Sequence, residues 1–191
     1  MKHKIIAISR QFGSGGRTIG KELAANLGIA CYDQELIEML AKKSGFSQSH
    51  VSELNEESTG AGFLPGRNDR VERTLQHTLW QKQRDIILEL SEKESCVIVG
   101  RCADHILRGR EDVLRVYIHA DKDKRAKRIV EVYGEREEAP LKRIADKDKR
   151  RISYYESFTN SKWGNAENYH ITLDSGELGI DTCVKLLMEL F

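Results

Sequence analysis

The stretch Ile5-Ile-Ala-Ile-Ser9, which runs into Arg10-Gln-Phe-Gly-Ser-Gly-Gly-Arg-Thr18, sets the architecture of this chain. Its first part is typical of a buried strand, and its second part is a glycine-rich turn. The segment from Ile19 to Leu27 then has the apolar spacing of an amphipathic helix. Such a unit aims backbone N–H groups and a helix N-terminus at one point, where a phosphate is stabilised. Phosphate binding is therefore the leading hypothesis, and the alternative is a glycine-rich turn with no ligand.

The turn departs from the standard phosphate-binding loop, G-x-x-x-x-G-K-[ST], and two alignments stay open. In the first, Arg17 replaces the lysine and the first glycine of the motif is missing. In the second, Gly13 and Gly15 supply motif glycines, Gly16 takes the position of the lysine, and Arg17 follows it. Thr18 is a candidate hydroxyl ligand in both alignments. Arginine can neutralise phosphate charge, although its planar fork differs from the point charge of lysine.

The composition is typical of a globular chain: 191 residues, a net charge of +1 at pH 7, 39% hydrophobic and 32% charged residues. This length suits one domain with a sizeable core. The near-neutral charge gives no electrostatic case for a nucleic-acid partner. Apolar runs such as Cys96-Val-Ile-Val99 are strand-sized, so we expect no membrane partner. Because Met1-Lys-His-Lys4 leads directly into the first strand without signal-peptide organisation, we expect a cytoplasmic protein.

Cysteines and histidines give no sign of a metal centre. The four cysteines, Cys31, Cys96, Cys102 and Cys183, form no C-x-x-C pair, and the six histidines are not paired at ligand spacing. We expect small, buried thiols in a reducing compartment, with Cys102 as the single candidate for an exposed one.

Strands and helices alternate along the rest of the chain. Further strands are expected at 29–33, 95–99, 113–118 and 169–173, helices at 34–44, 47–57, 69–93, 103–107, 121–132, 137–158 and 179–190, and a loop at 58–66. This alternation predicts an α/β fold with a parallel sheet and right-handed crossovers. Ligands of such sheets bind at the carboxyl ends of the strands. By that rule we expect four segments to lie close together in space: the Arg10–Thr18 loop, Asp33, Gly100-Arg101 and the segment after Ile118.

Several later motifs occur in a fixed order: Tyr32-Asp33, Val97-Ile-Val-Gly-Arg101, Asp148-x-x-Arg151 before Tyr154-Tyr155, Trp163-Gly164 and Tyr169. Together with Ser9-Arg-Gln-Phe-Gly-Ser-Gly-Gly-Arg17, they make the chain resemble the cytidylate kinase-like family, in the nucleoside monophosphate kinase group of P-loop proteins. The resemblance covers nearly the whole length. It implies one P-loop kinase-like domain over 1–191: a three-layer αβα sandwich with a five-stranded parallel sheet, an acceptor-binding insertion at 34–66 and a helical lid at 135–162.

The resemblance also implies an activity and a set of site residues. The activity is ATP-dependent phosphoryl transfer to a nucleoside monophosphate, with a cytidylate-type acceptor first, ATP and Mg²⁺ as cofactors, nucleotides as partners and the oligomeric state open. The donor phosphates would be held by Gly13, Ser14, Gly15, Gly16, Arg17 and Thr18, with Thr18 as the magnesium ligand. Asp33 and Arg101 would bind the acceptor. The lid would contribute Arg143, Lys147, Arg150 and Arg151, and the catalytic cations would be Arg17, Arg101, Arg143, Arg150 and Arg151. A loose phosphoryl-transfer transition state needs such alignment and charge neutralisation.

Two of the acceptor residues also have structural explanations. Asp33 could cap the helix that begins at Gln34. Arg101 could pair on the surface with Asp104 or Glu111.

The basic residues in the second half of the chain could likewise have a structural role instead of a catalytic one. Those between Lys142 and Arg151 alternate with acids, as in a solvated helix, although four of them fall on one side at i, i+4, i+7 and i+8. Those from Lys122 to Arg128 show no such restriction and are expected in solvent. Core packing is the expected role of the aromatic cluster Tyr154, Tyr155, Phe158 and Trp163, and stacking on a nucleobase is the alternative.

Two departures from the kinase pattern keep other functions open. The lysine of the loop is displaced or absent, and the third strand ends in Ile98-Val99-Gly100, without the acid that often holds the magnesium shell. Asp33 or Asp104 could replace that acid. The alternatives to a nucleoside monophosphate kinase are a small-metabolite kinase of the same fold and a nucleotide-binding module without catalysis.

Overall fold

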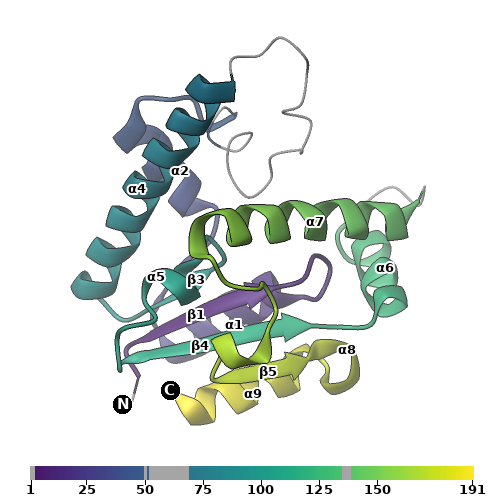
Figure 1. The fold of residues 1–191 in the computed structure, drawn as a ribbon. Coiled ribbons are helices and arrows are strands. Elements are labelled where there is room, and N and C mark those ends of the chain that lie inside the picture. The colour runs from purple at the N-terminus through teal and green to yellow at the C-terminus, as the bar shows by residue number, and fades with distance from the viewer. Residues whose placement is uncertain (1–2, 50, 52–68, 135–138) are drawn as a thin grey trace.

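The computed structural model describes residues 3–49, 51, 69–134 and 139–191, and at its centre lies a five-stranded parallel sheet (Figure 1). The strands follow the order β2-β3-β1-β4-β5, with every neighbouring pair parallel. Their bounds are β1 Ile5–Arg10, β2 Ala30–Tyr32, β3 Cys96–Val99, β4 Val113–His119 and β5 Ile171–Asp174. The α/β fold and its parallel sheet are thereby confirmed.

Strand β1 is the centre of the sheet, and all of its residues are buried. Ile8 pairs with Val99 of β3 on one side and with Val116 of β4 on the other. Continuous runs of β-branched residues are favoured where both faces of a strand are covered, which is the case here. The carboxyl end of β1, where the glycine turn starts, therefore lies between the ends of two neighbouring strands.

Two groups of helices cover the sheet (Figure 1). Helices α1 (Gly16–Leu27) and α9 (Ile180–Leu190) pack on one face, and α2 (Glu35–Ser44), α4 (Asp69–Lys93) and α5 (Ala103–Ile106) belong to the other. Helix α6 (Lys122–Glu131) follows β4, and α7 (Pro140–Thr159) runs from α6 back across the sheet toward α4 (Figure 1). The short elements η2 (Ala166–Asn168) and α8 (Ser175–Leu178) flank β5.

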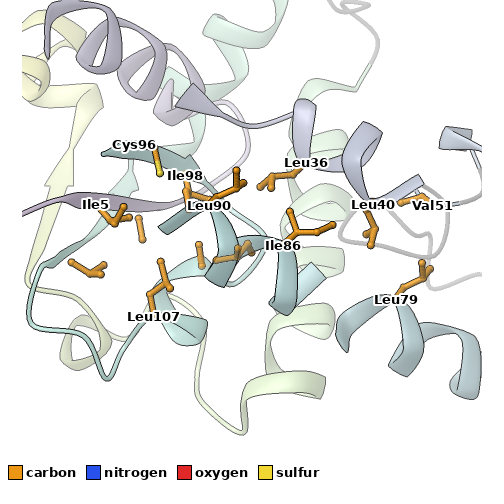
Figure 2. Close-up of a cluster of buried hydrophobic side chains, with 14 of the residues drawn as sticks. Ile5, Leu36, Leu40, Val51, Leu79, Ile86, Leu90, Cys96, Ile98 and Leu107 are labelled. Atoms are coloured by element: carbon orange, nitrogen blue, oxygen red, sulfur yellow. The ribbon is translucent and has the colours of Figure 1, made fainter. Parts of the chain in front are cut away.

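Alternating residues of β1 build two separate cores, because successive strand side chains point to opposite faces. Ile5 packs in a cluster with side chains of α2, α4 and α5, including Leu36, and with Leu107, which directly follows α5 (Figure 2). Ile6 packs in a second cluster with side chains of α1 and α9, including Leu23. Full burial of one such side chain stabilises the fold by about 1.5–3 kcal/mol.

The expected element boundaries hold within a few residues where the structure describes them. The long helix expected at 69–93 has these bounds in α4. Helix α7 begins at Pro140 rather than at 137, because proline is favoured at the first helical position. Of the expected acceptor-binding insertion at 34–66, the structure describes α2 and residues up to 49 and 51, and of the lid at 135–162 it describes 139 onward. The loop expected at 58–66 lies outside the described residues.

The expectation of an exposed Cys102 is wrong. Cys102 is 2% exposed, because α5, which begins directly after it, packs against β1 and α4 and draws this turn into the protein. Cys31 is instead the partly exposed thiol, and burial raises its pKa to about 11.

Candidate functional site: the glycine loop and its basic cavity

The turn between β1 and α1 keeps a left-handed backbone at two glycines, with φ +78° at Gly13 and +80° at Gly15. Neighbouring elements crowd both positions. A Cβ at Gly13 would lie 2.9 Å from Ile129 Cγ2, and a Cβ at Gly15 would overlap Ile180 Cδ1. Both positions therefore need glycine for conformation and for space. Helix α1 begins at Gly16 without a side-chain cap, so the amides of its first turn are open to an anion.

Hydrogen bonds tie the middle of the loop to the end of β4 and to α8. Ser14 Oγ donates to the Gln11 carbonyl at 2.9 Å, and the Ser14 N–H donates to the same oxygen at 3.3 Å. Ser175 Oγ in turn donates to the Ser14 carbonyl at 2.5 Å, and the Ala120 N–H donates to Gln11 Oε1 at 3.1 Å. Ser14, which the resemblance assigns to the donor phosphates, thus directs its hydroxyl into the protein.

A cavity of about 450 Å³ opens over this loop. The described residues that line it are Arg10, Gln11, Phe12, Gly13, Gly15, Gly16, Arg17, Gln34, Tyr133, Lys147 and Arg151. Four of these are basic and none is acidic. The cavity lining joins all three predicted donor-site glycines with Arg17 and with the lid residues Lys147 and Arg151. Thr18, in the first turn of α1, is half-buried and is not in this lining. Loop amides and converging cations form a site suited to a polyphosphate.

Arg17 and Asp33 form an ion pair at the edge of the cavity. Arg17 Nε lies 2.5 Å from Asp33 Oδ2; the arginine side chain is 47% exposed and the carboxylate 6%. The alternative role of Asp33 as a helix cap is wrong, because the N-cap of α2 is Gln34 and no side chain caps it. A buried carboxylate needs a partner, and Arg17 provides it.

Two basic residues on one side of helix α7 contact the glycine loop. Lys147 Nζ lies 5.9 Å and Arg151 Cζ 5.7 Å from the centroid of the Phe12 ring, within reach of a cation–π interaction. Arg151 Nη1 also donates to the Arg10 carbonyl at 3.0 Å. Of the other predicted lid cations, Arg143 is exposed and Arg150 half-buried, and neither is in the cavity lining.

A buried ion pair that the sequence analysis missed holds the loop from the other side. Arg125 of α6 is 3% exposed, which shows that the expectation of a solvated side chain is wrong for this residue. Its Nη1 lies 2.6 Å from Asp148 Oδ2 and donates to the Phe12 carbonyl at 3.1 Å, while the Phe12 N–H donates to Asp148 Oδ1 at 2.8 Å. Nothing in the basic run 122–128 distinguishes Arg125, since its partner is 23 positions away.

Arg101 lies in a buried turn that follows β3, and it is not among the residues that line the cavity. Three consecutive residues, Gly100, Arg101 and Cys102, have positive φ values of 77°, 58° and 54°. Gln83 of α4, a residue that the sequence analysis did not select, supports this turn by donating from Nε2 to the Arg101 carbonyl at 3.0 Å. Arg101 is buried, so the expected pairing on the surface with Asp104 or Glu111 is wrong.

Asp104 connects β1 to α7 through two hydroxyl donors. Ser9 Oγ donates to Asp104 Oδ1 at 3.0 Å, and Tyr155 Oη donates to Asp104 Oδ2 at 2.8 Å. Burial, with the nearby carboxylate, raises the pKa of the Tyr155 phenol far above its usual range, so the phenol stays a donor. Both carboxylate oxygens of Asp104 are thus engaged in structural hydrogen bonds.

The aromatic cluster expected after the lid helix divides into two packing groups. Phe158 stacks on Trp80 of α4 with ring centroids 4.8 Å apart, and Tyr154 lies beside both rings. Trp163 instead packs edge-on against Tyr117 of β4 at 5.5 Å. These contacts favour packing over nucleobase stacking.

The sheet order and the glycine loop at the end of the central strand define a P-loop kinase fold. A shikimate kinase from Acinetobacter baumannii shares this fold with a TM-score of 0.56 and 17% identity, covering 98% of this chain and 92% of that chain. Within this class, the chain belongs to the cytidylate kinase-like family, whose model matches residues 5–177.

Individual relatives agree with this assignment at low identity. The cytidylate kinase of Pyrobaculum calidifontis is 23% identical over 186 residues, covering 97% of this chain and 91% of the relative. That of Methanosarcina mazei is 26% identical over 181 residues, covering 89% and 86%. The crystal structure of an uncharacterized protein from Eubacterium ventriosum is similar with a TM-score of 0.74 and 30% identity, covering 97% and 96%. In the part of the chain that the structure describes, no helix combines the length and apolar character needed to cross a bilayer.

Proposed function

We propose that this protein transfers the γ-phosphoryl group of ATP to a nucleoside monophosphate, with a cytidylate-type acceptor. The observation that carries the proposal is the 450 Å³ cavity over the glycine loop, which brings Arg10, Arg17, Lys147 and Arg151 to the carboxyl end of the central strand. Membership in the cytidylate kinase-like family supports the same class of reaction.

In this proposal, the loop amides and Arg17 bind the donor phosphates. Left-handed Gly13 and Gly15 shape the loop around the anion, and Gly16 begins the helix whose N-terminus faces it. Lys147 and Arg151 neutralise charge on the transferring group from the side of α7. Phosphoryl transfer requires little beyond such positioning and charge stabilisation.

The acceptor is proposed to bind on the β2–β3 side of the loop. Asp33 follows β2, and its ion pair with Arg17 links the acceptor side to the donor side. Arg101 follows β3 and is proposed to bind the acceptor phosphate. Arg143 and Arg150 are proposed to act from α7 when substrates are bound.

The described residues fit a magnesium ion that is carried mainly by the nucleotide. Asp33, Asp104 and Asp148 are engaged with protein donors or cations, and among the described residues no group of three or more His, Cys, Asp or Glu side chains could hold a metal. Thr18 is the proposed protein ligand, with phosphates and water as the others. When bound, Mg²⁺ would neutralise charge on the β- and γ-phosphates.

A coupled assay of ADP formation tests the proposal. The purified protein is supplied with ATP and Mg²⁺ and with CMP, dCMP, UMP, AMP, GMP or a panel of small hydroxylated metabolites. We expect turnover with CMP, dCMP or UMP above the rate without acceptor. Turnover only with a metabolite would select the small-metabolite kinase, and tight ATP binding with no turnover would select the non-catalytic module.

A further inference from the structure

Arg10 is the last residue of β1, and none of the site roles expected from the sequence falls on it. It is 8% exposed, yet it lines the cavity over the glycine loop. A cation this well buried at the end of the central strand is held in place by its surroundings, unlike the half-exposed Arg17.

Two glycines from separate segments make room for the Arg10 side chain. A Cβ at Gly16 would lie 2.5 Å from Arg10 Cβ and 3.0 Å from Arg10 Cγ. A Cβ at Gly100 would overlap the guanidinium, at 2.7 Å from Arg10 Cζ. The stem of Arg10 therefore fills the space in which a side chain at position 16 would begin, and its head lies against the end of β3.

The start of α1 favours the second alignment of the loop, because Gly15 keeps the left-handed backbone of a turn glycine and Gly16 does not. Gly15 is the left-handed N-cap and Gly16 the first helical residue. In the motif G-x-x-x-x-G-K-[ST], the second glycine precedes the lysine, which reaches the β- and γ-phosphates. With Gly15 as that second glycine, the lysine position falls on Gly16, the first glycine position on Arg10 and the hydroxyl position on Arg17. Thr18, the proposed magnesium ligand, then lies one residue beyond the hydroxyl position of the motif. The chain thus has a basic residue where the motif has glycine, and glycine where the motif has lysine.

We propose that Arg10 is the fixed phosphate-binding cation of this site and that positions 10 and 16 have exchanged the glycine and the basic side chain of the phosphate-binding loop. The ligand is the terminal part of a nucleoside polyphosphate, so the inference rests on the proposed function and deepens it. Arg17, one position after the lysine site, is the more exposed cation and is ion-paired with Asp33. The bond from Arg151 to the Arg10 carbonyl holds the backbone from which the fixed cation extends.

Calorimetric titration with ADP and with inorganic tripolyphosphate tests the charge of Arg10. We expect R10M to bind both ligands roughly 10- to 100-fold more weakly than the wild type, as for the loss of a charge-assisted hydrogen bond. R10K, which keeps the charge, should retain most of the affinity. The control is R108M, which removes an exposed arginine outside the cavity lining. Wild-type-like affinity of R10M for both ligands would overturn the proposal.

The exchange itself is tested by reversing it. R10G should lose ADP affinity, and G16K should lose stability because its new side chain meets that of Arg10. The double variant R10G/G16K should fold and bind ADP far more tightly than R10G. A double variant that is unfolded, or that binds no better than R10G, contradicts the exchange. If wild-type protein binds neither ADP nor tripolyphosphate, the proposed function fails first, so the two failures are distinguishable.

Discussion

Asp148 of α7 accepts a hydrogen bond from the backbone N–H of Phe12 at 2.8 Å, across 136 positions of the chain. Arg125, which is paired with the same carboxylate, donates to the carbonyl of Phe12. One ion pair from two helices thereby satisfies both backbone polar groups of a loop residue. The conformation of the glycine loop thus depends on α6 and α7 as well as on its own glycines.

Asp148→Asn will lower the free energy of unfolding by about 3 kcal/mol, because it leaves the charge of Arg125 buried without its partner. Urea unfolding measures this change, and ADP titration will show weaker binding by the loosened loop. Asp146→Asn is the matched control, an exposed position on the same helix where about 0.5 kcal/mol or less is expected. Equal effects of the two variants would show that the pair does not hold the loop.

Gly15→Ala will impair both stability and phosphate binding. Positive φ costs a non-glycine residue about 1–2 kcal/mol, and here the added methyl group also overlaps Ile180. Gly28→Ala separates the two effects, since φ is +66° at Gly28 and no atom lies within 4 Å of the added Cβ. We expect Gly28→Ala to lose only the conformational part and to bind ADP normally. Normal ADP binding by Gly15→Ala would contradict the crowding argument.

A double-mutant cycle will show that Arg17 and Asp33 are coupled. Each of Arg17→Met and Asp33→Asn removes one member of the pair, and residues in direct contact show interaction energies of about 0.5–3 kcal/mol. The measurement is the unfolding free energy of the wild type, both single variants and the double variant. The same cycle on Lys93 and Glu94, whose charges are 3.6 Å apart and more exposed, should give a smaller value. Strict additivity at Arg17 and Asp33 would mean that the pair does not form in solution.

Stability will fall as the pH drops below about 6.5, and His105 accounts for part of that fall. Burial, followed by the charge of Arg108, lowers the pKa of His105 in the folded protein. Between this lowered pKa and the unfolded one, the unfolded chain binds more protons, so acidification favours unfolding. Urea unfolding at pH 7.5 and 5.5 measures the loss.

His105→Gln should reduce this loss of stability without removing it. His170 remains, and burial lowers its pKa in the same direction. An unchanged pH slope in His105→Gln would contradict the assignment.

Local pattern was sufficient for the α/β class and for most element positions. The β-branched runs of β1 and β3 identify strands, and the apolar spacing of 69–93 identifies a helix, because these signals depend on residues within a few turns. The glycine turn after a buried strand also located the cavity, since carboxyl ends of parallel strands share one edge.

Local pattern failed where a residue's role depends on a distant partner. The run 122–128 reads as a solvated surface, yet Arg125 is buried against Asp148. Asp33 stands directly before a helix, yet it pairs with Arg17 rather than capping α2. Neither pairing can be predicted from the residues that neighbour Arg125 or Asp33 in the sequence.

Short stretches of this chain therefore determine the succession of strands and helices along the sequence, the glycine turn and the motifs of the family. The identity of the cations at the loop is different: Arg10, Arg17, Lys147 and Arg151 meet because β1, α1 and α7 converge. Backbone conformation responds to neighbouring residues, whereas burial of a charge depends on which side chains the whole fold brings within hydrogen-bond distance. The position of the Arg10 side chain between Gly16 and Gly100 depends on the tertiary structure, because the two glycines come from separate segments of the chain.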